Sequence, residues 1–229
     1  LSLHDALPIY GFRCDVAMMV PDDFWKEAFT ELRKIKPDIF LLAEAEGPQF
    51  HTDGFNMTYA WNKHHIMNEI AKGTMSADTM DLAIQKDLKN YTADSYFMNF
   101  TSNHDENSWN GTEFERMGNG AKTFAVMAAT MPGMLLMYSG QEVALDHRLK
   151  FFDKDPIEWN EQPELHHFYK TLNQFHRDNF SGGELNFLHL HNNVLSFSRK
   201  KDEQEILVFL NLDKNRVTVT VHNGDHSQY

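Results

Sequence analysis

Patterns typical of buried strands alternate with patterns typical of helices over the first two thirds of this sequence. Five consecutive apolar residues lie between Asp38 and Glu44, as in a strand buried on both faces. From Asp22 to Lys36, apolar residues recur every three or four positions, as on one face of a helix. Strands that alternate with helices form right-handed βαβ units, so this part of the chain is restricted to a parallel sheet or barrel.

The alternating part contains five predicted strands. One ends at Asp15, and the others lie around Phe40, Phe55 (54–59), Phe97 (96–101) and Leu136 (134–138). Helices are expected between them, through 66–73, from a cap at Ser76 to about Asn90, and over 120–130.

The pattern changes after about residue 151. A helix pattern from Leu165 to Phe175 precedes Ser181-Gly182-Gly183. Four strand patterns follow, at 185–191, 194–199, 206–212 and 217–221. Short polar turns separate them, as in an antiparallel sheet. We therefore predict a barrel part at 10–180 and part of an antiparallel β-domain at 181–229.

Both ends of the sequence indicate an internal fragment of a longer protein. Residues 1–9, LSLHDALPI, resemble a translated sequencing adapter, so we exclude them from the fold prediction as an artefact. The last residues, HNGDHSQY, end abruptly after a strand pattern.

Charge and hydropathy exclude some classes of partner. The chain has 33 acidic and 21 basic side chains and a net charge of −12. This balance argues against nucleic acid or an anionic membrane as the main partner, and a neutral ligand remains open. No apolar run approaches the roughly 18 residues of a membrane span.

Three carboxylates follow predicted strands at their carboxyl ends, where catalytic groups gather in a parallel barrel: Asp15, Glu44 and Asp105. A pair of carboxylates is the minimum for hydrolysis of a glycosidic bond. Arg13 lies two residues before Asp15, so both side chains leave the strand on one face, and a guanidinium there favours an ionised nucleophile.

Other interpretations of these residues exist. A lone Asp after a strand more often caps a helix or forms a turn. The order and strand-end positions of all three carboxylates favour catalysis. A metal-dependent barrel hydrolase with His104, Asp105 and Glu106 as ligands is the alternative enzyme, disfavoured because no second His-rich strand end occurs. A non-catalytic glycan-binding protein would not need three intact carboxylates.

Several motifs resemble signature regions of the α-amylase superfamily of glycoside hydrolases. They are GFRCDVA at 11–17, LLAE at 41–44, FTSNHD at 100–105 and YSGQE at 138–142. The resemblance covers residues 10–150, and the later strand patterns resemble the trailing β-sandwich of that family. It implies an α/β fold with a partial (β/α)8 TIM barrel, about strands 4–8, followed by a partial antiparallel β-sandwich.

The resemblance also implies roles for individual residues. Asp15 would be the nucleophile, Glu44 the general acid and then base, and Asp105 the stabiliser of the oxocarbenium-like transition state. The implied substrate-binding residues are Arg13, Asn103 and His104. Glu46 is the rival to Glu44, which we prefer because it directly follows the apolar run.

The sequence departs from the family pattern in two places. The first signature region is absent, and Met18 and Met19 stand where many members have Lys-His. The resemblance therefore does not carry over contacts beyond the cleavage point or a calcium site that depends on them. No cofactor is certain, and calcium remains open for a full-length enzyme.

The expected function is a retaining glycoside hydrolase that cleaves α-glucosidic bonds in starch-like glucans or maltooligosaccharides through a covalent glycosyl-enzyme. A transglycosylase of the same superfamily is the close alternative. We expect the 229-residue chain alone to be inactive, because a barrel closes only with eight strands. The localisation is left open: no signal region occurs in this chain, and a periplasmic or extracellular full-length protein is compatible with the resemblance.

Overall fold

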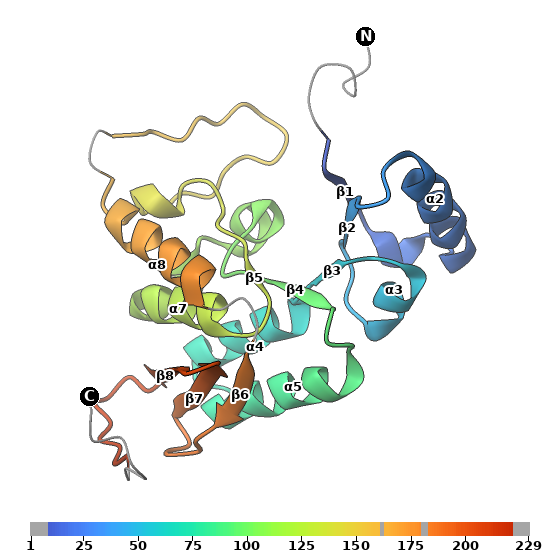
Figure 1. The fold of residues 1–229 in the computed structure, drawn as a ribbon. Coiled ribbons are helices and arrows are strands. Elements are labelled where there is room, and N and C mark those ends of the chain that lie inside the picture. The colour runs from blue at the N-terminus through green and yellow to red at the C-terminus, as the bar shows by residue number, and fades with distance from the viewer. Residues whose placement is uncertain (1–8, 161–162, 180–182, 222–229) are drawn as a thin grey trace.

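The computed structural model describes residues 9–160, 163–179 and 183–221 (Figure 1). The predicted artefact at the N-terminus and the last residues of the predicted β-domain therefore lie outside the described residues, apart from Ile9. Within the described ranges, no helix has the length and apolar character needed to cross a membrane.

Five parallel strands form the first sheet, and each pairs with its neighbour in sequence order. The strands are β1 (Gly11–Cys14), β2 (Phe40–Ala43), β3 (Met57–Tyr59), β4 (Tyr96–Asn99) and β5 (Met134–Leu135). The five predicted strands are confirmed, although β3, β4 and β5 are shorter than their apolar patterns. The sheet is open, because among the described strands β1 and β5 each have one partner. Such a sheet fits part of a (β/α)8 barrel.

Helices connect these strands and cover the sheet (Figure 1). The α-helices are α2 (Asp22–Ile35), α3 (Pro48–Asp53), α4 (Trp61–Lys72), α5 (Ala77–Asn90), α6 (Glu113–Met117), α7 (Ala121–Thr130) and α8 (His166–Asn179). The short 3-10 helices are η1 (Ala17–Met19), η3 (Gly118–Gly120) and η4 (Gln141–Val143), and η2 (Glu106–Asn110) is a π-helix. Gly73 caps the carboxyl end of α4, and its left-handed φ of 82° suits a residue without Cβ.

The apolar face of α2 buries aromatic residues against the start of the sheet. Trp25 and Phe29 are buried there and pack on Phe55, with ring centroids 5.2 and 4.7 Å apart. The Trp25 indole N–H donates to the carbonyl of Ala17, 3.1 Å away. This packing fixes the segment that follows β1, which carries Asp15.

A second, antiparallel sheet follows α8. It contains β6 (Glu184–Phe187), β7 (Val194–Lys201) and β8 (Gln204–Asn211). Its apolar face shares one buried cluster with the helices of the first part, where Leu195 and Phe197 join Met80 and Phe124. The parallel sheet followed by an antiparallel one agrees with a partial barrel and a partial sandwich. A domain boundary near residue 180 stays a prediction.

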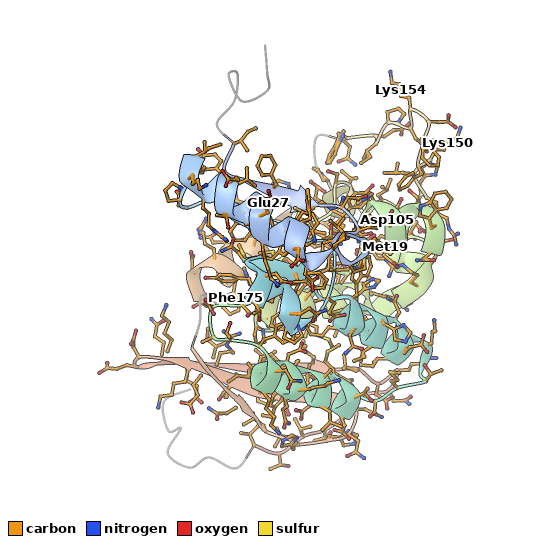
Figure 2. The ribbon with its side chains drawn as sticks, turned by 90° about the vertical axis from the view of Figure 1, so that its right-hand side faces the viewer. Met19, Glu27, Asp105, Lys150, Lys154 and Phe175 are labelled. Carbon is orange, nitrogen blue, oxygen red and sulfur yellow. The ribbon has the colours of Figure 1, made fainter. Side chains whose placement is uncertain are left out.

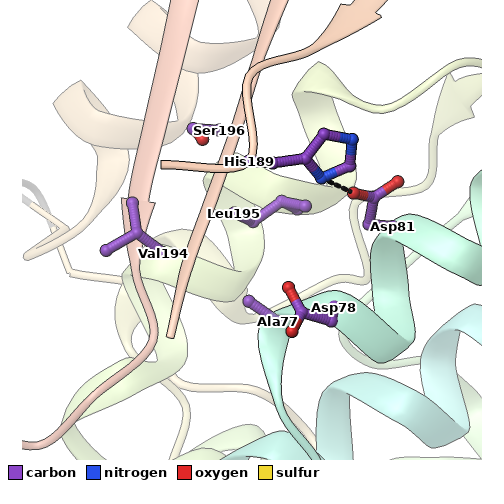
Figure 3. A pocket seen from close by; sticks show the side chains of 7 residues that line it. All are labelled: Ala77, Asp78, Asp81, His189, Val194, Leu195 and Ser196. Carbon is purple, nitrogen blue, oxygen red and sulfur yellow. Dashed lines mark ion pairs between the residues drawn. The ribbon is translucent and has the colours of Figure 1, made fainter. Parts of the chain in front are cut away.

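A contact between side chains also joins the connection between β6 and β7 to α5 (Figure 3). His189 Nδ1 lies 2.8 Å from Asp81 Oδ2, and the Gln85 amide donates to the other oxygen of Asp81 at 2.6 Å. His189 and Asp81 border a small pocket between α5 and the start of β7.

The prediction of a strand at 217–221 is wrong. These residues have no regular secondary structure, and β8 pairs only with β7 among the described strands. Alternating Val and Thr favour an extended backbone, but a strand forms only where a neighbour accepts and donates its ladder of hydrogen bonds.

His64 of α4 is an ionisable group buried in this scaffold. Its ring is 4 % exposed and stacks on Phe100 with centroids 4.6 Å apart. Burial, with a smaller contribution from the nearby charge of Arg116, lowers the pKa of His64 to about 3. The imidazole is therefore neutral in the folded protein at pH 7.

We expect His64 to make the protein less stable as pH falls from about 6.5 to about 3. In this window the unfolded chain binds a proton that the folded chain excludes, so the residue contributes a slope of up to about 1.4 kcal/mol per pH unit. Urea unfolding between pH 4.5 and 7 should show a shallower dependence on pH in His64→Gln. His65→Gln is the matched control, because His65 is exposed. Equal slopes in wild type and His64→Gln would contradict the assignment.

Candidate active site

Arg13 lies between two of the predicted catalytic carboxylates. Its Nη1 lies 2.5 Å from Asp15 Oδ1, and its Nη2 lies 2.7 Å from Glu44 Oε1. The parallel pairing of β1 with β2 creates this arrangement, because Cys14 lies opposite Ala43 and both carboxylates follow their strands directly. One guanidinium thus orients both carboxylates, and its planar fork fixes their spacing.

The two carboxylates have different surroundings. The Glu44 side chain is 10 % exposed, whereas the Asp15 side chain is 71 % exposed. The Val16 backbone N–H donates to Glu44 Oε2 at 2.7 Å. Val16 has a left-handed φ of 38°, which is rare for a β-branched residue and is typical of strained functional segments. The Glu44 carboxyl is therefore held inside the protein, whereas the Asp15 carboxyl is exposed to solvent.

Tyr59 at the end of β3 completes the surroundings of Arg13. The Arg13 Nε donates to Tyr59 Oη at 3.3 Å. Burial raises the pKa of Tyr59, and the charges of Glu44 and Asp105 raise it further while Arg13 opposes them. Burial lowers the pKa of Arg13, but its contacts with Tyr59, Asp15 and Glu44 outweigh this and leave the pKa raised. The phenol thus stays protonated beside a permanent positive charge.

Tyr59 was not predicted from the sequence. Its position could have indicated it, because it is the last residue of β3 and so lies at the carboxyl end of a strand, as the carboxylates do.

Asp105 follows β4 along the same edge and is visible in Figure 2. Its Oδ2 lies 3.4 Å from His104 Nε2, and its charge raises the pKa values of Tyr59 and Tyr138 in addition to the effect of their burial. Asn103 is 2 % exposed, and its Oδ1 accepts the Glu106 backbone N–H at 2.8 Å. The buried amide of Asn103 therefore shapes the turn that presents His104 and Asp105.

The described contacts place Glu44, and not its rival Glu46, on Arg13. Glu46 Oε2 accepts the backbone N–H of Asn62 at 2.8 Å, at the start of α4. Burial raises the pKa of Glu46, and the hydrogen bond from Asn62 and the charge of Lys63 oppose it. β2 ends at Ala43, so the alternation that would have put both glutamates on one face stops there.

The alternative set of metal ligands does not converge. Asp105 contacts His104, whereas Glu106 lies 3.8 Å from His64 and accepts a hydrogen bond from Asn110. Across the described residues, no three His, Cys, Asp or Glu side chains come together in a way that could hold a metal ion.

Comparison with known proteins supports the resemblance on independent grounds. No protein-family model matches the chain. A maltogenic α-amylase from Bacillus acidopullulyticus is 27 % identical over 228 residues, which cover 91 % of this chain and 38 % of the relative. An α-1,4-glucan:maltose-1-phosphate maltosyltransferase from Picrophilus torridus is 26 % identical over 93 % of this chain and 34 % of its own length.

A solved structure agrees with these relatives. The noncanonic maltogenic α-amylase AmyB from Thermotoga neapolitana superimposes with a TM-score of 0.76 at 27 % identity, over 88 % of this chain and 48 % of that protein. The resemblance to the α-amylase superfamily is confirmed. The chain spans less than half the length of each of these three proteins.

Gln141, in the YSGQE motif at 138–142, contacts the buried carboxylate of Glu113, which was not predicted from the sequence. The carboxylate of Glu113 on α6 accepts hydrogen bonds from Thr101 at 2.9 Å and from Gln141 at 2.5 Å. It also accepts one from the Tyr169 hydroxyl of α8 at 3.2 Å. Burial and the charge of Glu113 raise the pKa of Tyr169, which keeps this donor protonated. The network ties the segment before Asp105 to the segment after β5.

We expect Glu113→Ala to lower the free energy of unfolding by about 2–4 kcal/mol, because three buried donors lose the acceptor that they share. Chemical denaturation monitored by circular dichroism measures this loss. Glu27→Ala on the exposed face of α2 is the control and should change stability by less than about 0.5 kcal/mol. Equal stability of the Glu113 and Glu27 variants would mean that the network does not stabilise these segments.

Proposed function

We propose that this chain carries the catalytic residues of a retaining glycoside hydrolase acting on α-glucosidic bonds in starch-like glucans or maltooligosaccharides. The observation that carries the proposal is the Arg13 guanidinium, which contacts both Asp15 and Glu44 at the ends of adjacent strands. Retaining enzymes hold their two carboxyl groups about 5–5.5 Å apart, whereas inverting enzymes leave room for a water between them. Because one guanidinium contacts both carboxylates, the two groups lie close together, which favours the retaining class. The names of the relatives support an α-glucan as substrate.

In the proposed reaction, the exposed carboxylate of Asp15 attacks the anomeric carbon of the sugar. Glu44 donates its proton to the departing glycosidic oxygen, and an ester bond to Asp15 replaces the glycosidic bond. Glu44, now ionised, takes a proton from water, and the water oxygen displaces Asp15 with net retention of configuration.

The neighbouring residues have supporting roles in this proposal. Arg13 and Tyr59 keep both carboxylates in position, which is the preorganisation that such chemistry needs. Asp105 and His104, which contact each other, hold hydroxyl groups of the sugar and stabilise the positive charge that develops in the transition state.

A transglycosylase is the second candidate, and the maltosyltransferase among the relatives favours it. The glycosyl-enzyme on Asp15 is the same, but a sugar hydroxyl replaces water as the acceptor. Products longer than the supplied maltooligosaccharide, separated by chromatography, would identify transfer.

We expect Glu44→Gln to lower kcat on maltooligosaccharides by about 100- to 10,000-fold, since it removes the general acid and base. Asp15→Asn should lower kcat at least as much, because it removes the nucleophile. Reducing-sugar release by the gene product that contains this chain measures both effects.

Glu46→Gln is the matched control, because Glu46 contacts the start of α4. It should change kcat by no more than a few-fold. Full activity of Glu44→Gln together with loss in Glu46→Gln would exchange the roles of the two glutamates. Trapping with a fluorinated glycosyl fluoride should add one glycosyl mass to the wild-type protein and none to Asp15→Asn.

A further inference from the structure

Exposed aromatic side chains lie beside His104. Trp109 is 58 % exposed, Phe151 is 40 % exposed and Phe152 is 85 % exposed. The ring centroid of Phe151 lies 6.0 Å from that of His104, 5.2 Å from that of Trp109 and 4.8 Å from that of Phe152. We name His104, Trp109, Phe151 and Phe152 the aromatic row. It extends from the residue that contacts Asp105 out to solvent.

Two segments far apart in sequence build the aromatic row. Trp109 lies in the π-helix η2, which begins directly after Asp105. Phe151 and Phe152 lie in the long connection between η4 and α8. In Figure 2 this connection, marked by Lys150 and Lys154, rises above Asp105. π-helical turns are uncommon and occur frequently at functional sites.

Polar contacts of the buried Asn107 and of Asp155 fix this connection. The side chain of Asn107, which is 3 % exposed, donates to the His147 carbonyl at 3.2 Å and accepts the Leu149 N–H at 2.8 Å. Asp155 accepts the Lys150 N–H at 3.0 Å and lies 2.9 Å from His147 Nε2.

Further contacts join the same two segments. Arg148 Nε lies 2.8 Å from Glu115 Oε2, and the Thr112 hydroxyl donates to Asp146 at 2.6 Å. The rings of the aromatic row are therefore exposed on a backbone that is already ordered, which reduces the entropy lost when a ligand binds.

We propose that the aromatic row binds successive glucosyl units of an α-glucan beside the cleaved bond and gives the site a preference for longer chains. This proposal rests on the proposed function. A pyranose ring presents C–H groups on its faces and hydroxyl groups at its edge, so a flat apolar ring covers its face while the hydroxyls stay in water. Clustered exposed aromatic side chains mark ligand-binding grooves or interfaces.

The charges near the aromatic row favour a neutral ligand. Lys150 and Lys154 alternate with Asp153 and Asp155 along the connection. Because the two signs offset each other, this surface does not select a strongly charged ligand, which agrees with an uncharged polysaccharide. The continuity of the row with His104, which contacts Asp105, favours substrate over a second protein.

The test measures binding separately from turnover. Trp109→Ala and Phe152→Ala are made in the gene product that contains this chain, both alone and in the Asp15→Asn background. We expect the dissociation constant for maltoheptaose, from calorimetry, to rise about tenfold or more in each. The KM for maltoheptaose should rise more than the KM for maltotriose, because the shorter sugar reaches fewer rings.

Tyr96→Ala is the matched control, because Tyr96 is 48 % exposed and lies at the amino end of β4, the end of the strand away from Asp105. It should leave both constants unchanged. Trp109→Phe and Phe152→Tyr keep an aromatic face and should restore binding, which separates lost stacking from misfolding.

Unchanged maltoheptaose binding in Trp109→Ala and Phe152→Ala would overturn the aromatic row, and the proposed function would stand if Asp15→Asn is inactive. If Asp15→Asn remains active while the alanine variants lose binding, the row stands and the catalytic assignment fails. If Trp109→Ala and Phe152→Ala change the oligomeric state on size-exclusion chromatography but bind sugar as the wild type does, the aromatic row is an interface between proteins. That result would also overturn the proposal.

Discussion

The contact of Arg13 with Glu44 depends on the parallel register of β1 and β2, and the rest of the site depends on that contact. A carboxylate that is 10 % exposed is unfavourable without a positive partner. Side chains alternate between the two faces of a strand, so a slip of one residue in β1 would turn Arg13 to the other face and leave Glu44 unpaired. The left-handed backbone at Val16 and the buried phenol of Tyr59 belong to the same arrangement. The scaffold thus has to hold one register for the chemistry to be available.

Local patterns in the sequence predict much of the first sheet. The helix at α2 follows from its apolar spacing and from acidic residues in its first turn, and Glu44 follows the run that forms β2. These features depend on neighbours in the chain. Tyr59 and Glu113 escaped prediction because their partners lie far away in sequence, 46 residues from Tyr59 to Arg13 and 28 from Glu113 to Gln141. The strand predicted at 217–221 failed for a related reason, since pairing requires a partner that the pattern does not contain.

The antiparallel sheet does not have a core of its own among the described residues. Leu195, Phe197 and Leu210 pack against Met80 and Phe124 of the helices, and the pair of His189 with Asp81 lies at the margin of this contact. Sharing a core couples the two sheets, because the apolar surface of each is removed from water by the other. The second sheet therefore supports the helices behind the site as well as adding to the fold.

The π-helix after Asp105 has an evolutionary consequence. Its ladder includes the bond from the Gly111 N–H to the Glu106 carbonyl, a spacing of five residues where an α-helix has four. Deleting a single residue from this turn would restore α-helical winding and rotate whatever follows by about 100°. Trp109 would then face elsewhere, while Asp15, Glu44 and Asp105 would keep their places. Under the roles proposed above, the insertion or deletion of a single codon in this turn would change sugar binding at Trp109 and leave the proposed catalytic carboxylates in place.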